Sequence, residues 1–198
     1  MNKYITCREG FIERNHSKFN RYQCSMSVIN CCRKLEFENS DGEISLLRAA
    51  WDGNYKMCAL LLDKYPEPDV KNNSGWTALM CAARWGHIDI CEILLKHGAN
   101  PNMQDENGNS ALMVAVSSNQ IEVCEILLSN KADPNLRKHD GMTPLLSATW
   151  VGNADICSLL LQNGANLYDT DNNGWSSLLM ATKLQKFKIL QLFSQYEE

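Results

Sequence analysis

The chain has 198 residues, of which 44% are hydrophobic, 8% aromatic and 21% charged, close to the proportions of ordinary globular proteins. Its 19 Lys and Arg against 23 Asp and Glu leave a formal net charge of −4, which argues against a disordered chain and against a general nucleic-acid binder. No apolar run approaches the ~18 residues of a membrane span, and charged residues interrupt the beginning of the chain before a secretory signal core could form.

The beginning of the chain differs in charge from the rest. Residues 1–40 hold seven Lys and Arg against four Glu, a net charge of +3, whereas residues 41–198 hold twelve against nineteen, a net charge of −7. We therefore place a domain boundary near Asn39, with residues 1–38 as a basic, cysteine-containing extension. Its segment 25–37 either forms an amphipathic helix that covers the next domain or belongs to a flexible tail. Its thiols lack the C-x2-C spacing of zinc modules, so we assign it no metal.

From residue 39 onward the sequence repeats with a period of 33 residues. Several residue types recur in one register, the clearest being Gly42, Gly75, Gly108, Gly141 and Gly174, then Leu46, Leu79, Leu112, Leu145 and Leu178, then Cys58, Cys91, Cys124 and Cys157. Such agreement between series indicates five copies of one supersecondary unit. Their approximate bounds are 39–71, 72–104, 105–137, 138–170 and 171–198.

Each unit predicts two helices joined by a turn, as the second copy illustrates. Gly75 stands where a hairpin-like tip needs a positive φ, and Thr77 can cap a first helix. Gly86 ends that helix, and a second helix follows as far as Gly98, where a left-handed cap ends it. One unit alone leaves its apolar stripe uncovered, so neighbouring units must stack. We therefore expect an all-α solenoid of stacked helix–turn–helix units with hairpin-like tips.

These units resemble ankyrin repeats. The family pattern D-x-x-G-x-T-P-L-H-x-A-A-x-x-G-H, followed by an I-V-x-x-L-L-x-x-G-A-D segment, is similar to DGMTPLLSATWVGNADICSLLLQNGANL at 140–167, and the resemblance covers about residues 39–198. An apolar residue replaces the family's histidine in every unit, and Ile44 stands where the first unit should have threonine. In the last unit a polar outer cap is suggested by Lys183, Lys186, Lys188 and Gln191. The resemblance implies a non-enzymatic protein-interaction module.

All five tryptophans occupy the family's variable surface positions, either beside the tip glycine or near the end of the first helix. Stacking of the units would align these positions into one concave stripe, and tryptophan and arginine are the residues most enriched in interface hot spots. We expect the stripe to bind a protein partner; the alternative is that its tryptophans pack against the neighbouring unit. The tip residues Trp76 and Trp175 should resist packing best. The expected partner-binding residues are Trp51, Trp76, Arg84, Trp85, Met142, Trp150, Val151, Trp175 and Lys183.

The titratable residues do not predict catalysis. The cysteine series occupies the family's buried valine position, and helices packed ~8–10 Å apart do not bring four thiolates within the ~2.3 Å zinc–sulfur bond length. The sequence contains no Ser/His/Asp order, nucleophile elbow or phosphate-cradling loop. We therefore expect no enzymatic activity, no cofactor, no metal and no small-molecule substrate.

The remaining expectations concern modification, location and role. The resemblance marks Asn102 and Asn135, in the loops between units, as candidates for asparaginyl hydroxylation. The odd number of cysteines, nine, favours reduced thiols and thus the cytoplasm or also the nucleus. We expect a monomer that binds a protein partner, without nucleic acid or membrane. Two alternative roles stay open, namely a substrate-recruiting adaptor of a larger complex such as a ubiquitin ligase, and an inhibitor or regulator of a partner enzyme.

Overall fold

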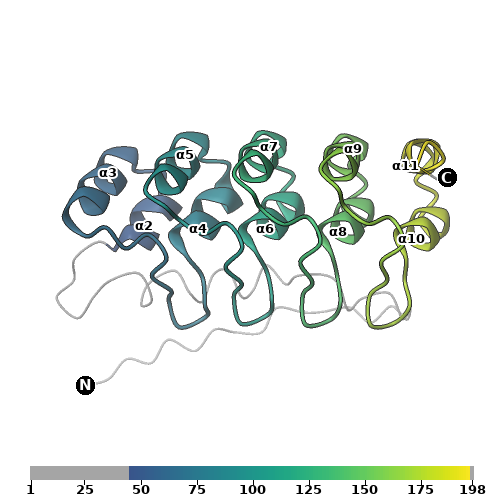
Figure 1. Cartoon of the computed structure of the whole chain (residues 1–198), viewed down its shortest axis with the longest axis horizontal. Coiled ribbons are helices and arrows are strands. Elements are labelled where there is room, and N and C mark those ends of the chain that lie inside the picture. The colour runs from purple at the N-terminus through teal and green to yellow at the C-terminus, as the bar shows by residue number, and fades with distance from the viewer. Residues whose placement is uncertain (1–44, 197–198) are drawn as a thin grey trace, which may run out of the picture. The chain divides into compact units, whose positions relative to one another are not determined.

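The computed structural model describes residues 45–196, which contain ten α-helices arranged as five consecutive pairs (Figure 1). The first helices of the pairs form one row and are α2 (Leu46–Trp51), α4 (Ala78–Trp85), α6 (Ala111–Ser117), α8 (Pro144–Val151) and α10 (Ser177–Lys183). The second helices form a row above them and are α3 (Tyr55–Lys64), α5 (Ile88–Lys96), α7 (Ile121–Ser129), α9 (Ala154–Gln162) and α11 (Phe187–Phe193). None of these helices is long and apolar enough to cross a membrane.

The two rows of helices confirm the predicted all-α solenoid. Long loops connect successive pairs, and in Figure 1 their hairpin-like tips all turn to the side away from the second row. We call each helix pair with the tip that precedes it a repeat and number the repeats one to five. The predicted extension 1–38, with its segment 25–37, lies outside the described residues.

Hydroxyl side chains begin the first helix of every repeat. In repeat two the Thr77 hydroxyl accepts a hydrogen bond from the main-chain nitrogen of Met80 at 3.3 Å, as predicted. Ser110, Thr143 and Ser176 cap the later repeats in the same way. Repeat one, which lacks the threonine, uses Ser45 one residue later, and its hydroxyl accepts from the Arg48 nitrogen at 3.3 Å. A shift of one residue therefore restores the cap.

In repeats two to four each hairpin tip lies against the tip of the next repeat. Main-chain hydrogen bonds join them, with Glu106 N donating to Ser74 O at 3.2 Å and His139 N donating to Asn107 O at 3.2 Å. Gly75, with a φ of +79°, lies against the main chain of the following tip. A Cβ atom on Gly75 would lie 2.9 Å from Glu106 N, so glycine is required for the close approach as well as for the turn.

Long polar side chains connect the repeats a second time. Lys71 Nζ donates to the carbonyl oxygen of Gln104 at 2.8 Å, and Gln104 Nε2 donates to that of Arg137 at 2.9 Å. The Arg137 guanidinium in turn donates to the carbonyl oxygen of Thr170. Because every bridge spans 33 residues, these side chains fix the register between neighbouring repeats.

The core lies between the helices of neighbouring repeats. Where the family has histidine, Met80, Met113 and Leu146 are fully buried, so apolar packing replaces the polar link that the histidine would make. The fifth repeat differs, because its equivalent residue, Leu179, is exposed. Lys183, Lys188 and Gln191 of the expected polar outer cap are exposed, but the last repeat also exposes the apolar Leu178 beside Leu179.

Candidate protein-binding site

Three of the five tryptophans meet between repeats one and two. Trp51 and Trp85 are the last residues of α2 and α4, and Trp76 lies in the tip before α4. The ring centroid of Trp51 lies 5.3 Å from that of Trp85, edge to face, and 6.2 Å from that of Trp76 at an interplanar angle of 55°. Each such contact contributes about 0.5–1.5 kcal/mol beyond the burial of apolar area. We call these three residues the tryptophan cluster.

The tryptophan cluster has a packed base and one exposed ring. Trp51 and Trp76 are half-buried against the hydrophobic core, whereas Trp85 keeps 48% of its surface exposed. Contrary to expectation, Trp76 does not project freely from its tip, because its ring contacts Trp51 and its main-chain nitrogen donates to Asn72 Oδ1 at 2.9 Å. Trp51 and Trp76 therefore pack against the neighbouring repeat, and within the cluster only Trp85 offers a large accessible ring.

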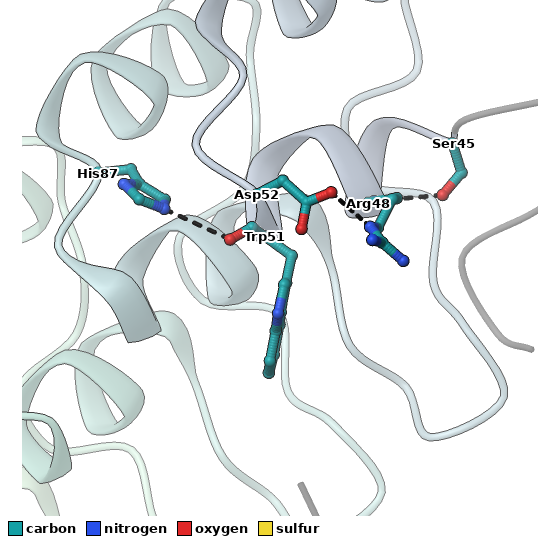
Figure 2. A network of polar contacts seen from close by, with 5 residues as sticks. All are labelled: Ser45, Arg48, Trp51, Asp52 and His87. Carbon is teal, nitrogen blue, oxygen red and sulfur yellow. Dashed lines mark hydrogen bonds and ion pairs between the residues drawn. The ribbon is translucent and has the colours of Figure 1, made fainter. Parts of the chain in front are cut away.

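Polar contacts hold the main chain around Trp51, as Figure 2 shows. His87 of repeat two lies with its Nε2 3.4 Å from the carbonyl oxygen of Trp51, an arrangement in which the ring N–H donates. Ser45 caps the start of α2, and Arg48 pairs with Asp52 across one turn of the same helix. The Trp51 ring points away from His87 (Figure 2). The cluster therefore rests on a main chain that is fixed from both repeats.

A polar surface follows the cluster in repeat three. Arg84 Nη1 donates to the hydroxyl of Ser118 at 3.2 Å, and that hydroxyl donates to the carbonyl oxygen of Val114 at 2.8 Å. Arg84 is half-buried and held in place across the boundary between repeats. Ser117 and Ser118 occupy the positions that hold Arg84 and Trp85 in repeat two, so the middle of the expected stripe has only small polar side chains.

Repeats four and five bring the remaining expected residues to the same positions. Trp150 is half-buried and Val151 is 40% exposed at the end of α8. Lys183 is exposed at the end of α10. Trp175 is half-buried in the fifth tip, where its main-chain nitrogen donates to Asp171 Oδ1 at 2.8 Å. Val151 and Lys183 are therefore the accessible side chains of this half.

The expectation that Met142 lies on the surface is wrong, because only 5% of the side chain is exposed. Its tip is covered by the tip of repeat five, where Asn172 N donates to the carbonyl oxygen of Asp140 at 3.0 Å. Burial of an apolar side chain beneath a covering tip removes it from water and stabilises the fold. Met142 therefore contributes to the contact between repeats and offers no accessible surface.

Asn102 and Asn135 connect repeats through their amide groups. Asn102 Nδ2 donates to the carbonyl oxygen of Lys131 at 3.0 Å, while its Oδ1 accepts from Asp133 N at 2.8 Å. Asn135 makes the equivalent pair of bonds one repeat later, at 2.9 and 2.8 Å. These bonds give both asparagines a structural role. Hydroxylation of either residue stays a prediction.

The four thiols of the second helices are buried, and burial keeps them in the protonated form. Cys58, Cys91, Cys124 and Cys157 are free of disulfides and fully buried on the second helices. Burial disfavours the thiolate and raises the pKa of Cys58 to about 11 and that of Cys91, Cys124 and Cys157 to about 12. Within residues 45–196 no three His, Cys, Asp or Glu side chains are grouped so as to hold a metal ion.

A polar depression of about 460 Å³ lies at the turns between the helices of repeats three to five. Asn153 Nδ2 donates to Asn119 Oδ1 at 2.6 Å across it, and Asp155 and Lys188 supply its charges. Its lining contains no hydroxyl or thiol nucleophile beside a base. The depression therefore provides no arrangement for acyl or phosphoryl transfer.

Sequence reasoning missed two exposed residues, Leu178 and Leu179 of α10. Both continue series that are fully buried in repeats two to four, namely those of Leu145 and Leu146. The signal was present in the sequence, because the fifth unit keeps the same apolar residues at these positions.

Comparison with known proteins agrees with this geometry. A family model described as ankyrin repeats (3 copies) matches residues 46–138 and 130–198. No curated protein matches the chain. Ankyrin repeats generally act as protein-interaction modules. Because the matched segments cover most of the sequence and coincide with the five helix pairs, the chain belongs to the ankyrin-repeat family.

Proposed function

We propose that this protein binds a protein partner, without catalysis of its own, through the surface formed by the ends of the first helices and the neighbouring tips. The observation that carries the proposal is Trp85, an almost half-exposed ring supported by the packed rings of the tryptophan cluster. Tryptophan side chains supply much of the energy of protein interfaces, and a fixed ring loses little entropy when it binds.

The surface has two apolar parts separated by a polar one. The tryptophan cluster forms the first part, and Trp150 with Val151 forms the second. Between them, repeat three presents Ser117 and Ser118. A partner that fits this surface has two apolar anchors joined by a polar stretch. The net negative charge of the repeats disfavours nucleic acid as that partner.

The test compares the intact chain with a Trp85→Ala, Val151→Ala double variant. Both side chains are exposed, so their removal leaves the packed rings beneath in place. The two chains are used to capture proteins from a lysate, and the affinity of a captured protein is then measured after purification. We expect the double variant to bind at least about tenfold more weakly, since a hot-spot side chain contributes about 2 kcal/mol or more.

Tyr168→Ala is the matched control, because Tyr168 is a strongly exposed aromatic residue outside the proposed surface. Circular dichroism should show equal helix content in all variants. Equal affinity of the double variant and the intact chain would contradict the proposal. Loss of affinity on the Tyr168→Ala change instead would place the site elsewhere.

The same surface would serve an adaptor or an enzyme inhibitor. Deletion of residues 1–38 tests the adaptor, in which that segment contacts the larger complex. Inhibition of a captured enzyme by the intact chain identifies the inhibitor. The free, buried thiols support a location in a reducing compartment, the cytoplasm or also the nucleus.

A further inference from the structure

The last repeat exposes a surface that is covered by the next repeat in repeats two to four. Leu178 and Leu179 of α10 are 39% and 40% exposed, whereas their equivalents in repeat four, Leu145 and Leu146, are fully buried beneath repeat five. Leu190 of α11 is half-buried, although the cysteine at its position in repeats one to four is fully buried. We call this surface the C-terminal face; it comprises Leu178, Leu179, Thr182, Leu190 and Ser194.

The polar members of the C-terminal face are already hydrogen-bonded within their own helices. Thr182 Oγ1 donates to the carbonyl oxygen of Leu178 at 2.9 Å, and Ser194 Oγ donates to that of Gln191 at 2.9 Å. Thr149, the equivalent of Thr182 in repeat four, makes the same bond at 2.8 Å and is fully buried under repeat five. The hydroxyls therefore allow this face to be covered without loss of a hydrogen bond.

The fifth tip is open in the same way. Gly174 has a φ of +79°, like the other tip glycines, yet no atom lies within 4 Å of the Cβ position above it. In repeat four the corresponding Cβ position on Gly141 is 2.6 Å from Asn172 N of the following tip. The helices and the tip of repeat five therefore both leave room for a further repeat to pack against them.

Repeat one exposes the complementary surface. Leu60 of α3 is 64% exposed, whereas the equivalent Ile93 is half-buried behind repeat one. Met57 and Leu61 are half-buried, although the residue equivalent to Met57 in repeat two, Ile90, and that equivalent to Leu61, Leu94, are fully buried. We call this surface the N-terminal face; it comprises Met57, Leu60 and Leu61.

We propose that a second copy of this chain stacks head to tail on the first, with its N-terminal face against the C-terminal face of repeat five. The contact continues the interface that joins the repeats within one chain, because the two faces are the two halves of that interface. Head-to-tail contacts are heterologous and do not close, so the assembly grows with protein concentration. The inference replaces the expectation of a monomer and does not depend on the tryptophan cluster.

The experiment uses sedimentation velocity on the full chain over a range of concentrations, with Leu179→Glu and Leu60→Glu as interface variants. A carboxylate placed in either face would be buried unpaired if the faces met. We expect the intact chain to gain mass with concentration and each variant alone to stay monomeric. A mixture of the two variants should form a one-to-one dimer, because each variant retains one intact face.

Ile88→Glu is the matched control, since Ile88 of α5 is 39% exposed, like Leu178, but lies on neither face. It should assemble like the intact chain, and all variants should keep their helical circular dichroism. If Leu179→Glu does not fold, Thr182→Glu tests the same face. A monomeric intact chain at every concentration would overturn the proposal. So would a dimer that is lost with Leu179→Glu, unaffected by Leu60→Glu and not restored in the mixture, because that pattern indicates a tail-to-tail contact.

Discussion

A tip glycine has two separate roles, and the end of the solenoid distinguishes them. Gly108 and Gly174 have φ angles of +82° and +79°, so both occupy the left-handed region that disfavours other residues. A Cβ on Gly108 would lie 2.8 Å from Lys138 Cα of the next tip, whereas a Cβ on Gly174 meets no atom within 4 Å. The first glycine therefore serves conformation and contact, and the second serves conformation alone.

Replacement by alanine should separate these two contributions. Gly174→Ala is expected to lower the free energy of unfolding by about 1 kcal/mol. Alanine is strained in the left-handed region, and the lower conformational entropy of the unfolded alanine variant offsets part of that strain. Gly108→Ala should lower it by about 2–4 kcal/mol, because the main chain of the next repeat must also move. Urea unfolding at neutral pH measures both changes. Equal losses would show that the close approach between tips contributes nothing.

Single residues also show which surface positions could not be predicted from the sequence. Met142 and Trp76 follow equivalent glycines, and the sequence placed both on the surface. Met142 is covered by the tip of repeat five, while Trp76 packs on Trp51 of repeat one. Both outcomes depend on contacts with a neighbouring repeat, which the pattern within one repeat does not contain. The exposure of Trp85, by contrast, follows from its own place at the end of α4.

At the scale of the helix, neighbouring serines at the start of α10 have opposite roles. The Ser176 hydroxyl accepts from Leu179 N at 3.2 Å and caps the helix. Ser177 is buried at the first helical position, and among the described residues its hydroxyl finds no hydrogen-bond partner. Repeats two and three have alanine at the position of Ser177.

Alanine at these two sites should shift stability in opposite directions. Ser176→Ala should lower the free energy of unfolding by about 1 kcal/mol through loss of the cap. Ser177→Ala should raise it by about 1 kcal/mol, because a buried hydroxyl without a partner no longer has to leave water. Thermal unfolding of the two variants beside the intact chain checks both signs. A loss of stability in Ser177→Ala would mean that its hydroxyl has a partner after all.

The helices themselves were largely predictable, and the reason is local. The hydrophobic period and the punctuating glycines depend only on each repeat's own residues, so Thr77 and Gly86 bound α4 as predicted. The start of α2 was harder, because Ile44 cannot cap and Ser45 takes over the role. The apolar ends of the solenoid could not be read from a single repeat, since Leu178 and Leu145 are the same residue in the same register and only Leu145 is covered by a neighbouring repeat.

At the scale of the whole molecule, the same contacts recur along the solenoid axis and act together. Tip-to-tip bonds, the Lys71–Gln104–Arg137 bridges and the asparagine bridges all link one repeat to the next. Stability in such an array is close to a sum of repeat and interface contributions. A group that recurs in several repeats therefore affects the whole solenoid several times over.

The cysteine series is such a group, and it should make the fold sensitive to alkali. The pKa of these thiols is about 11 for Cys58 and about 12 for Cys91, Cys124 and Cys157, against 9.0 for an unburied thiol. Above a pH of about 9 the unfolded chain releases protons that the folded chain retains, so stability falls as pH rises. Each thiol contributes a slope approaching about 1.4 kcal/mol per pH unit until its folded pKa is reached.

Replacement of these four thiols by valine should remove most of this slope while the core stays packed. The buried thiol of Cys81 on α4, whose pKa is also raised by burial, remains in the variant. We expect the quadruple variant to unfold at a pH about one unit higher than the intact chain, measured by circular dichroism over an alkaline pH series. The difference between the two proteins isolates the four replaced thiols. The free energy of unfolding at neutral pH serves as the control and should change by less than about 1.5 kcal/mol per site. Equal alkaline midpoints would show that the thiolates form without loss of the fold, which burial of these second-helix cysteines argues against.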